Sequence, residues 1–402
     1  MNLWPFGKKI PPVSLVYDIG SSTVGAALVT FEKNNTPTIH YTVRKPIAFQ
    51  HRVNPEILLF DKKNTLQNIT EEVLRVGIPY LKLSLDARVS ITDVYCMLGS
   101  PWYISKMHVL KIEKPDEFSV TERDIAALIS EQEVAFKKTF KKEGDTGTDS
   151  LIVIEKKIVN TKVNGYEVNN VYLKKARTLE LSLFMSAVEQ RVLKHIRSVL
   201  NPAFSFRKLY FHSFPLAYFT VTRDIFHDLS DFLIVDVRGE ITDVSLIQKN
   251  ALSETVSFPL GRHFIMRKIC ETLRLTPEVG ASFIKLFNQG KTDGRTKNEI
   301  EAILSEAEGD WRATFRSATL DLGRHSLLPS RAYLITDFDF GSLIAGWMAR
   351  EKIDRLGIST EQFTVEYLND EKMAGHLSWS KRAKHDAFLA VGALFLNKLD
   401  NL

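Results

Sequence analysis

The sequence predicts an α/β protein built from two related halves, with a small α+β domain inserted in the first. Strand-like and helix-like segments alternate along the 402 residues, which is typical of sheets covered by helices. Two similar strand–turn–strand segments, around Asp18 and Asp236, lie about 218 residues apart. Between them, residues 82–180 carry strands and a capped helix of their own. A duplicated fold with a ligand cleft between the halves follows from this pattern.

In the first 150 residues, the strand–turn–strand spans 13–31, where Gly and Ser interrupt β-prone apolar runs. A helix is expected at 64–76, followed by strand-like pieces in 81–99. Thr121 begins a further helix, because Thr121 and Asp124 fit a capping box. Residues 141–150 form a polar loop.

In the middle of the chain, residues 150–171 read as strands with a hairpin turn at Asn164–Gly165. A long helix is predicted next, because apolar residues recur every fourth position; they are Phe184, Val188, Val192, Ile196 and Leu200. The second strand–turn–strand covers 231–247, and the chain is then mainly helical from 264 to about 319, with a polar stretch at 289–299. Residues 332–350 read as strand, turn and helix, and a last helix covers 384–399.

Composition excludes several classes of protein. The chain is 44% apolar and 25% charged with a net charge of +5, and its lysines and arginines form no basic stripe, so nucleic acid is not an expected partner. Cys96 and Cys270 have no metal or redox spacing, which favours a reducing cytoplasm. No apolar run reaches the roughly 20 residues needed to cross a bilayer. Trp4, Phe6, Lys8 and Lys9 could add a modest membrane contact.

The two strand–turn–strand segments suit a phosphate ligand. Aligning "LVYDIGSSTVGAALV" with "LIVDVRGEITDVSLI" places Asp18 on Asp236. Backbone N–H groups of such turns bind phosphate oxygens, Gly20 permits close approach, and carboxylates at the strand ends hold Mg²⁺ through water. The alternative is that both aspartates merely cap turns. A P-loop is excluded because Ala26–Ala27 stands where Lys-Ser/Thr is required, and a serine hydrolase is unsupported without a G-x-S-x-G elbow.

With these motifs in place, the chain resembles the actin-like ATPase superfamily, whose core is ribonuclease H-like, and within it the family of the cell-division protein FtsA and the type IV pilus assembly protein PilM. "DIGSSTVG" and "VDVRGEITDVSLI" resemble the two phosphate motifs, and "AYLITDFDFGSLIAGWM" stands where the adenosine motif belongs. "HDAFLAVGALFL" resembles the closing helix. The resemblance implies a first half at 1–81 and 181–230, an inserted domain at 82–180, and a second half at 231–402 with a helical subdomain at about 262–331.

The resemblance implies that ATP or ADP with Mg²⁺ binds in the cleft. The candidate nucleotide-binding residues are Asp18, Gly20, Ser21, Ser22, Thr23, Asp236, Arg238, Gly239, Thr242, Lys285 and Thr336, and Asp18 and Asp236 are the candidate Mg²⁺ ligands. No catalytic residue is assigned.

Four of five nucleotide motifs depart from the family pattern. Gly25 replaces a lysine that reaches the phosphates, Arg238 replaces a glycine and would either pair with a phosphate or block the turn, and Ser282 replaces a ribose-binding glutamate. Thr336–Asp337 replaces paired glycines, and the bulky 337–340 segment crowds the backbone there. The sequence therefore predicts weak nucleotide binding and at most a weak ATPase.

The resemblance implies a cytoplasmic scaffold or adaptor at the inner face of the membrane, which binds a cytoplasmic peptide of a membrane partner in a type IV pilus or related machine. The chain ends after its closing helix, which favours the PilM type over the FtsA type with its C-terminal amphipathic anchor. Alternatives are an FtsA-like division protein, a small-molecule kinase of the same superfamily, which needs a carboxylate base on the acceptor hydroxyl, and a filament former or other homo-oligomer.

Overall fold

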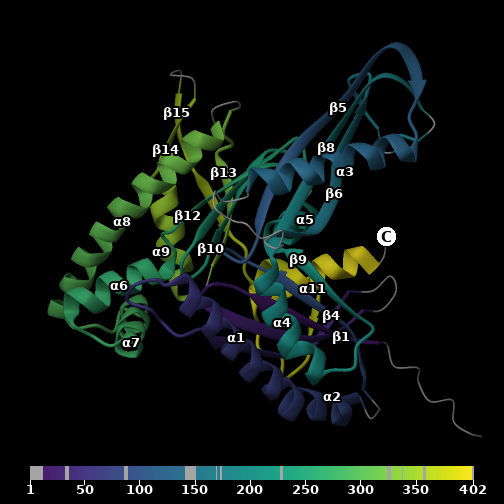
Figure 1. Cartoon of the computed structure of the whole chain (residues 1–402). Helices are drawn as coiled ribbons and strands as arrows, with labels where there is room; N and C mark the ends of the chain where they lie inside the picture. Colours follow the sequence, from purple (N-terminus) through teal and green to yellow (C-terminus); the bar gives the residue numbers. More distant parts are fainter. Residues whose placement is uncertain are drawn as a thin grey trace, which may run out of the picture.

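A computed structural model of the chain describes residues 12–31, 36–85, 89–140, 151–168, 170–172, 174–226, 230–323, 327–336, 338–355 and 359–400. Trp4, Phe6, Lys8, Lys9, the polar loop at 141–150 and Asp337 lie outside the described residues. Two sheets form the centre of the molecule and a third sheet projects from one of them (Figure 1).

The sheet of the first half has the order β17-β3-β2-β1-β4-β9. β1 pairs antiparallel with β2, β2 antiparallel with β3, and β4 and β9 continue the sheet in parallel. Its strands are β1 (Val13–Ile19), β2 (Thr23–Thr30), β3 (Thr38–Pro46), β4 (Ile91–Leu98), β9 (Lys208–Ser213) and β17 (Ser378–Trp379).

The sheet of the second half repeats this pattern with the order β12-β11-β10-β13-β16. β10, β11 and β12 are antiparallel neighbours, whereas β13 and β16 run parallel to β10. The strands are β10 (Phe232–Val237), β11 (Thr242–Gln248), β12 (Ala251–Phe258), β13 (Arg331–Thr336) and β16 (Thr364–Tyr367). The predicted duplication is therefore present in the sheet topology itself.

Helices cover both faces of each central sheet. α5 (Phe214–Ile225) and α11 (Ala387–Asp400) lie between the two sheets and share one apolar core with both of them. The outer face of the first sheet is covered by α1 (Pro55–Glu72), a π-helical turn η1 (Val73–Gly77), α2 (Ile78–Leu85) and α4 (Gln190–Ala203). The outer face of the second is covered by α6 (Arg262–Leu273), α8 (Gly294–Leu322) and α9 (Phe338–Ala349), with α7 (Pro277–Asn288) against α6.

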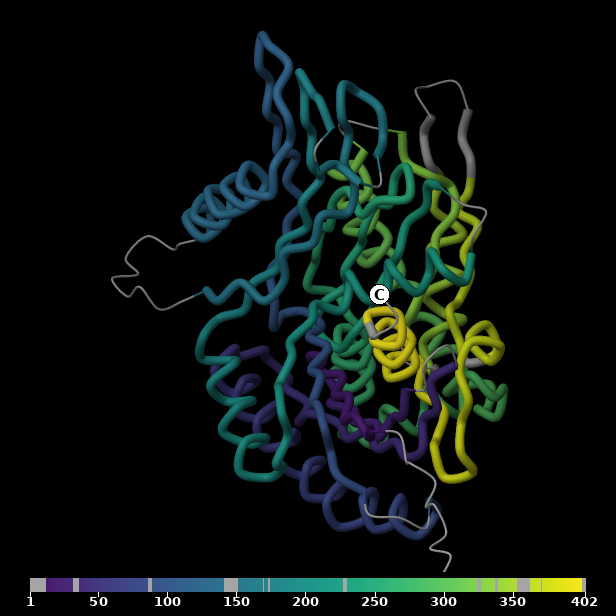
Figure 2. Tube along the Cα trace, turned by 90° about the vertical axis from the view of Figure 1, so that its right-hand side faces the viewer, coloured from purple at the N-terminus to yellow at the C-terminus, as the bar shows by residue number. Residues whose placement is uncertain are grey.

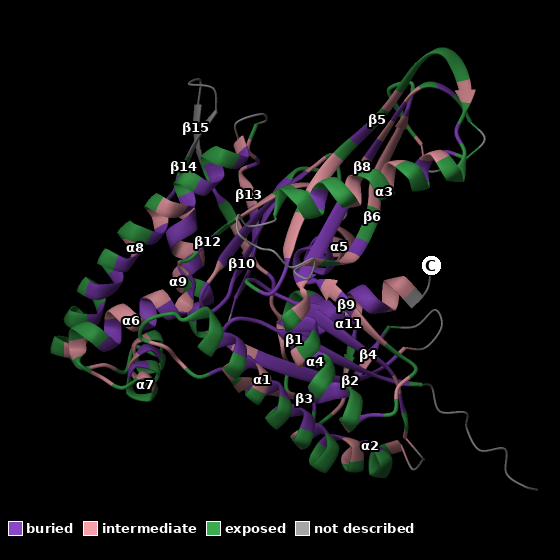
Figure 3. Cartoon of the chain, viewed as in Figure 1, coloured by how far each residue is buried: buried purple, intermediate pink, exposed green. Residues whose placement is uncertain are grey.

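The projecting unit is an α+β sheet of its own, with the order β5-β8-β6-β7 (Figures 1 and 2). It consists of β5 (Ile104–Ser119), β6 (Leu151–Val163), β7 (Tyr166–Glu167) and β8 (Lys175–Glu189), with α3 (Glu122–Thr139) packed on one face. Figure 3 shows that the outer side of α3 is exposed, whereas the strands of the central sheets are buried. A short ribbon β14 (Lys352–Arg355)–β15 (Ser359–Gln362) and α10 (Asp370–Met373) complete the described elements.

Two local sequence signals, a helix cap and a hairpin turn, form the structures that they predict. The Thr121 hydroxyl accepts a hydrogen bond from the Asp124 N–H, and the Asp124 carboxylate accepts one from the Thr121 N–H, so the capping box that starts α3 is formed. Asn164 and Gly165 have φ of 51° and 84° in the turn from β6 to β7, the left-handed conformation that an Asn-Gly turn provides.

The predicted helix from Phe184 is wrong in its first part. Phe184 and Val188 belong to β8, and α4 begins only at Gln190. Residues 183–188 of β8 are buried on both faces, because one face packs in the core of the projecting unit and the other, with Phe184 and Val188, packs in the cores of the first half. The two-residue alternation of a half-exposed strand is therefore lost there, and the apolar run reads as the start of the following helix.

The first domain boundary also differs. β4 pairs with β1 in the first sheet, so the inserted unit follows Leu98, whereas residue 82 lies inside α2. The strand-like residues 81–85 are helical because the helix predicted at 64–76 extends from Pro55 through the π-helical turn to Leu85. At the other end, β8 continues past residue 180 to Glu189.

Candidate functional site

The two predicted phosphate turns have the same backbone geometry. Asp18 pairs with Gly25 across the first hairpin, and Asp236 pairs with Asp243 across the second. In the first turn the Gly20 N–H donates to the Thr23 carbonyl at 3.0 Å. In the second, the Arg238 N–H donates to the Ile241 carbonyl, also at 3.0 Å. The alignment of the two segments is therefore correct residue for residue, and Arg238 takes the position that Gly20 has in the first turn.

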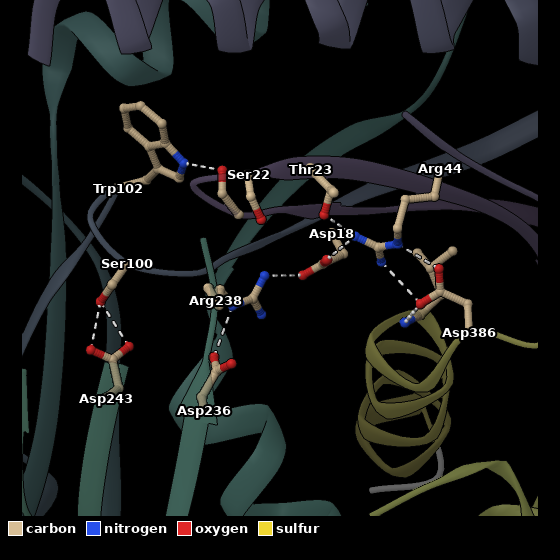
Figure 4. A network of polar contacts seen from close by, with 12 residues as sticks. Asp18, Ser22, Thr23, Arg44, Ser100, Trp102, Asp236, Arg238, Asp243 and Asp386 are labelled. Carbon is tan, nitrogen blue, oxygen red and sulfur yellow. Dashed lines mark hydrogen bonds and ion pairs between the residues drawn. The ribbon is translucent and has the colours of Figure 1, made fainter. Parts of the chain in front are cut away.

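Arg238 bridges the two aspartates (Figure 4). Its Nη1 lies 2.9 Å from Asp18 Oδ1 and its Nε lies 2.8 Å from Asp236 Oδ2. The side chain is 4% exposed, and its guanidinium lies over the rings of Phe214 and Phe388, at the beginnings of α5 and α11. One arginine thus joins both halves and both helices between them.

A second arginine, Arg44 on β3, approaches Asp18 from the other side. Its Nη1 lies 2.9 Å from Asp18 Oδ2 and 2.8 Å from the Thr23 hydroxyl, and its Nε lies 2.6 Å from Asp386. Arg44 is the cross-strand partner of Gly25, and a Cβ on Gly25 would lie 2.7 Å from Arg44 Nη2. Arg44 therefore fills the space above the position where the family resemblance expects a lysine.

The hydroxyls and backbone of the first turn are engaged with the protein itself. Ser21 Oγ accepts a hydrogen bond from the Glu240 N–H at 3.0 Å, and Ser22 Oγ accepts one from Arg262 Nε at 3.3 Å. The Trp102 indole N–H donates to the Gly20 carbonyl at 2.6 Å. The donors to Ser21 and Ser22 come from the second half, so the first turn is already bound to protein groups across the cleft.

The remaining predicted residues divide into two groups. The Thr242 hydroxyl donates to the Leu260 carbonyl and the Thr336 hydroxyl to the Val237 carbonyl, each at 2.8 Å, beside the second turn. Lys285 is exposed on α7, and no described contact joins it to the aspartates. The structure therefore brings the predicted residues together at the two turns except for Lys285.

Asp243 forms a further buried centre, which was not among the predicted site residues. Its carboxylate accepts hydrogen bonds from Ser100 at 2.7 and 2.9 Å, from Tyr103 at 3.0 Å and from Ser257 at 2.6 Å. Burial raises the pKa of Asp243, and the hydrogen bonds oppose that rise. Ser100 and Tyr103 follow β4 of the first half, so Asp243 is another link between the halves. The sequence signal that could have identified Asp243 is its position opposite Asp236 across the hairpin.

Asp236 is less well paired than Asp18. Burial raises the pKa of Asp236 to about 7, although Arg238 opposes this rise. Its Oδ1 has no hydrogen-bond partner, whereas both oxygens of Asp18 accept from guanidinium groups. The two aspartates are equivalent in sequence position, but their electrostatic surroundings differ.

The residues present do not fit a Mg²⁺-nucleotide in this arrangement. A Cβ on Gly239 would lie 2.2 Å from the Cβ of Ser22, so the two turns touch where phosphates would separate them. A Cβ on Gly20 would lie 2.8 Å from Arg238 Nη1, so the guanidinium covers the small residue meant for close approach. Among the described residues, no cluster of three or more His, Cys, Asp or Glu side chains could hold a metal ion.

A second candidate site is a groove between the projecting unit and the first half. Its cavity has a volume of about 290 Å³. The β6 segment Glu155–Val159 forms one wall, and α5 and α11 form the other with Leu216, Phe219, Phe395 and Leu399. Lys157, Arg223 and Lys398 also line the groove, and Asp224 pairs with Arg223 and Lys398, so the apolar floor has a charged rim with a basic excess.

Buried Glu155 fixes the position of β6 beside this groove. Its carboxylate accepts hydrogen bonds from the Ser213 N–H at 3.0 Å, from Ser186 Oγ at 2.6 Å and from His212 Nδ1 at 3.0 Å. Ser213 ends β9 of the first half, so the projecting sheet is attached to the first half at the groove itself. A buried carboxylate with several donors holds such a junction rigidly.

Comparison with solved structures identifies the fold. A chain of the PilM–PilN type IV pilus biogenesis complex superposes with a TM-score of 0.60 at 15% sequence identity, covering 98% of this chain and 99% of that one. This protein has the actin-like fold. Its two β-sheets with the same strand order, the helices between them and the projecting unit all belong to that superposed length.

Two other solved structures are more distantly similar. The ethanolamine utilization protein EutJ from Carboxydothermus hydrogenoformans has a TM-score of 0.43 at 10% identity over 96% of this chain and 90% of that one. A Bacteroides thetaiotaomicron protein with an actin-like ATPase fold has a TM-score of 0.40 at 11% identity over 98% and 99% of the two chains. No family model matches the sequence, and no curated protein matches it.

Within the described ranges, none of the helices is both long enough and apolar enough to cross a membrane.

Proposed function

We propose that this protein is a cytoplasmic scaffold at the inner face of the membrane, where it binds an extended cytoplasmic segment of a membrane partner in the groove beside β6. The groove carries this proposal, because it combines an apolar floor, a charged rim with a basic excess and a strand edge. The superposed PilM chain comes from a type IV pilus biogenesis complex with PilN, which supports a partner-binding role in a pilus or related machine.

The free edge of β6 supports recognition by strand addition. One edge of β6 pairs with β8 along its length, whereas β7 pairs with the other edge only at Lys162 and Val163. Among the described residues, no strand pairs with that edge between Leu151 and Asn160, and the Thr161 carbonyl beyond accepts a hydrogen bond from the Val168 N–H. An added peptide strand would gain main-chain hydrogen bonds there and place alternate side chains on the apolar floor.

The test is binding of labelled synthetic peptides that cover the cytoplasmic segments of membrane proteins encoded beside this gene, measured by fluorescence anisotropy. Val159→Asp and Leu399→Asp place a charge in the groove and should weaken binding at least about tenfold, which is 1.4 kcal/mol. Val109→Asp is the matched control, because Val109 is 63% exposed on β5, the opposite edge of the same sheet.

Two results would contradict the proposal. One is equal weakening by Val159→Asp and Val109→Asp, which would mean that the groove has no special part in binding. The other is strong, salt-resistant flotation of the purified protein with anionic liposomes in the absence of any peptide, since a protein that binds membranes directly needs no partner segment.

Nucleotide has at most a secondary place in this function. We propose that ATP or ADP binds weakly if at all and is not turned over, because the residues of the two turns contact one another. Steady hydrolysis at about 1 s⁻¹ or more, an ordinary enzymatic rate, that is lost in Asp18→Ala would show that the protein is an ATPase after all.

A further inference from the structure

Arg238 is not required by the turn in which it lies. The same backbone turn is built in the first half with a glycine at this position, and both turns make the same 3.0 Å hydrogen bond. The φ of Arg238 is not in the left-handed region. Any small residue would therefore complete the turn, and the role of the arginine must lie in what its side chain contacts.

The side chain of Arg238 is fitted into a space that two glycines and two rings leave open. Cβ atoms on Gly99 and Gly20 would lie 2.5 Å from Arg238 Cζ and 2.8 Å from Nη1. Phe214 and Phe388 are 4.3 and 4.5 Å from the guanidinium, measured from Cζ to the ring centroids. The first half, the second half and both helices between them thus contribute to one arginine site.

The charges at this centre are those of a cation bound between two carboxylates. Asp18 and Asp236 are buried carboxylates from opposite halves, and ionised carboxylates without a counter-charge are strongly unfavourable in such surroundings. Arg238 contributes one positive charge to both of them, and Arg44 contributes a second to Asp18. Arg238 therefore takes the place between the two carboxylates where a cation would bridge them, while Arg44 divides its charge between Asp18 and Asp386.

We infer that Arg238 is a built-in replacement for the bound cation of an actin-like cleft and that it holds the two halves closed without metal or nucleotide. The guanidinium connects the halves directly, and the contacts Glu240–Ser21 and Asp243–Ser100 close the cleft around it. A phosphate could reach Gly20 only after this guanidinium had moved away from Asp18. The cleft then stays closed under all conditions, and its closure does not depend on whether a nucleotide is present.

The test compares the full-length protein with Arg238→Gly, which restores the residue of the first turn. Thermal unfolding and small-angle X-ray scattering are recorded with EDTA, with MgCl₂ and with MgCl₂ plus ATP. In the wild type, the unfolding temperature should change by less than about 1 °C and the radius of gyration should stay constant among the three conditions, since a ligand that does not bind the native state adds no stability.

Arg238→Gly should lower the unfolding temperature by at least about 5 °C, because two buried carboxylates lose their shared counter-charge. It should also expand in EDTA, and Mg²⁺ or Mg²⁺ with ATP should recover at least about 3 °C. Arg312→Ala is the matched control. Arg312 pairs with buried Glu351 inside the second half, so its loss should destabilise the protein with no response to Mg²⁺ or ATP.

If Arg238→Gly does not fold, Arg238→Lys provides the comparison, because it keeps the charge but cannot reach both carboxylates with one planar fork. The inference is overturned if the wild type itself is stabilised by Mg²⁺ with ATP by about 3 °C or more. It is also overturned if Arg238→Gly remains as compact and as stable in EDTA as the wild type.

Discussion

Lys62 gives the sharpest pH prediction, because it is a buried amine with no hydrogen-bond partner. Its side chain is fully buried on α1, and its Nζ lies 4.5 Å from the centre of the Trp102 ring. Burial lowers the pKa of Lys62 to about 7, a decrease that nearby Cys96 partly opposes. The ammonium form is therefore disfavoured in the folded protein but not in the unfolded chain.

The sign of the effect follows from proton counting. Between pH 7 and the ordinary lysine pKa near 10.5, the unfolded chain holds more protons at this residue than the folded protein does, so stability rises with pH in that window. At 1.36 kcal/mol per pKa unit, Lys62 costs about 4 kcal/mol at pH 7 and about 2 kcal/mol at pH 9. The wild type should gain about 2 kcal/mol between these pH values from this residue alone.

Lys62→Met keeps an unbranched side chain, one atom shorter than lysine, and removes the charge. We expect it to raise the free energy of unfolding at pH 7 by up to about 4 kcal/mol and to remove the gain between pH 7 and pH 9. Urea unfolding followed by circular dichroism at both pH values measures this, with exposed Lys82→Met as the control. A Lys62→Met variant that is less stable at pH 7, or that keeps the wild-type pH dependence, would refute the reasoning.

Four further substitutions test local features of the fold. Gly99→Ala should cost about 2 kcal/mol, because its Cβ would meet the Arg238 guanidinium, which two ion pairs hold in place; a thermal melt equal to that of the wild type would contradict this. Thr121→Ala removes the capping box of α3 and should cost about 1 kcal/mol, seen as faster amide exchange in α3; unchanged exchange would show that the cap contributes nothing. Gly165→Ala should cost about 1 kcal/mol and speed amide exchange at the β6–β7 turn, because the φ of Gly165 is 84°. Gly309→Ala in α8 should instead be neutral or stabilising, because a Cβ at Gly309 has open space.

Local sequence signals predicted local structure well. The two aspartate turns, the Thr121 cap and the Asn164–Gly165 turn depend on neighbouring residues, and each is present. The duplication could also be predicted from the sequence, because the same strand–turn–strand pattern occurs twice.

Features that depend on distant pairing could not be read in the same way. Arg44 and Asp386 are 342 positions apart, and nothing near either residue indicates that they meet at Asp18. The boundary between β8 and α4 was misplaced because the end of β8 is buried on both faces. This burial removes the alternation of apolar and polar residues that marks a half-exposed strand. Lys285 was selected by resemblance to a motif, but its helix lies on the outer layer of the second half.

The contacts at Asp18 and Asp236 give the two acidic residues a structural role that needs no nucleotide. Asp18 accepts from two arginines, one on the neighbouring strand and one on the opposite half, so its loss would leave two guanidinium groups without their shared carboxylate. The Asp236 carboxylate accepts a hydrogen bond from one arginine, and its Oδ1 has no hydrogen-bond partner. Asp236 is therefore held less firmly at the junction of the two halves than Asp18 is. Both aspartates are therefore held by the ion pairs that join the two halves, and these ion pairs need no bound phosphate.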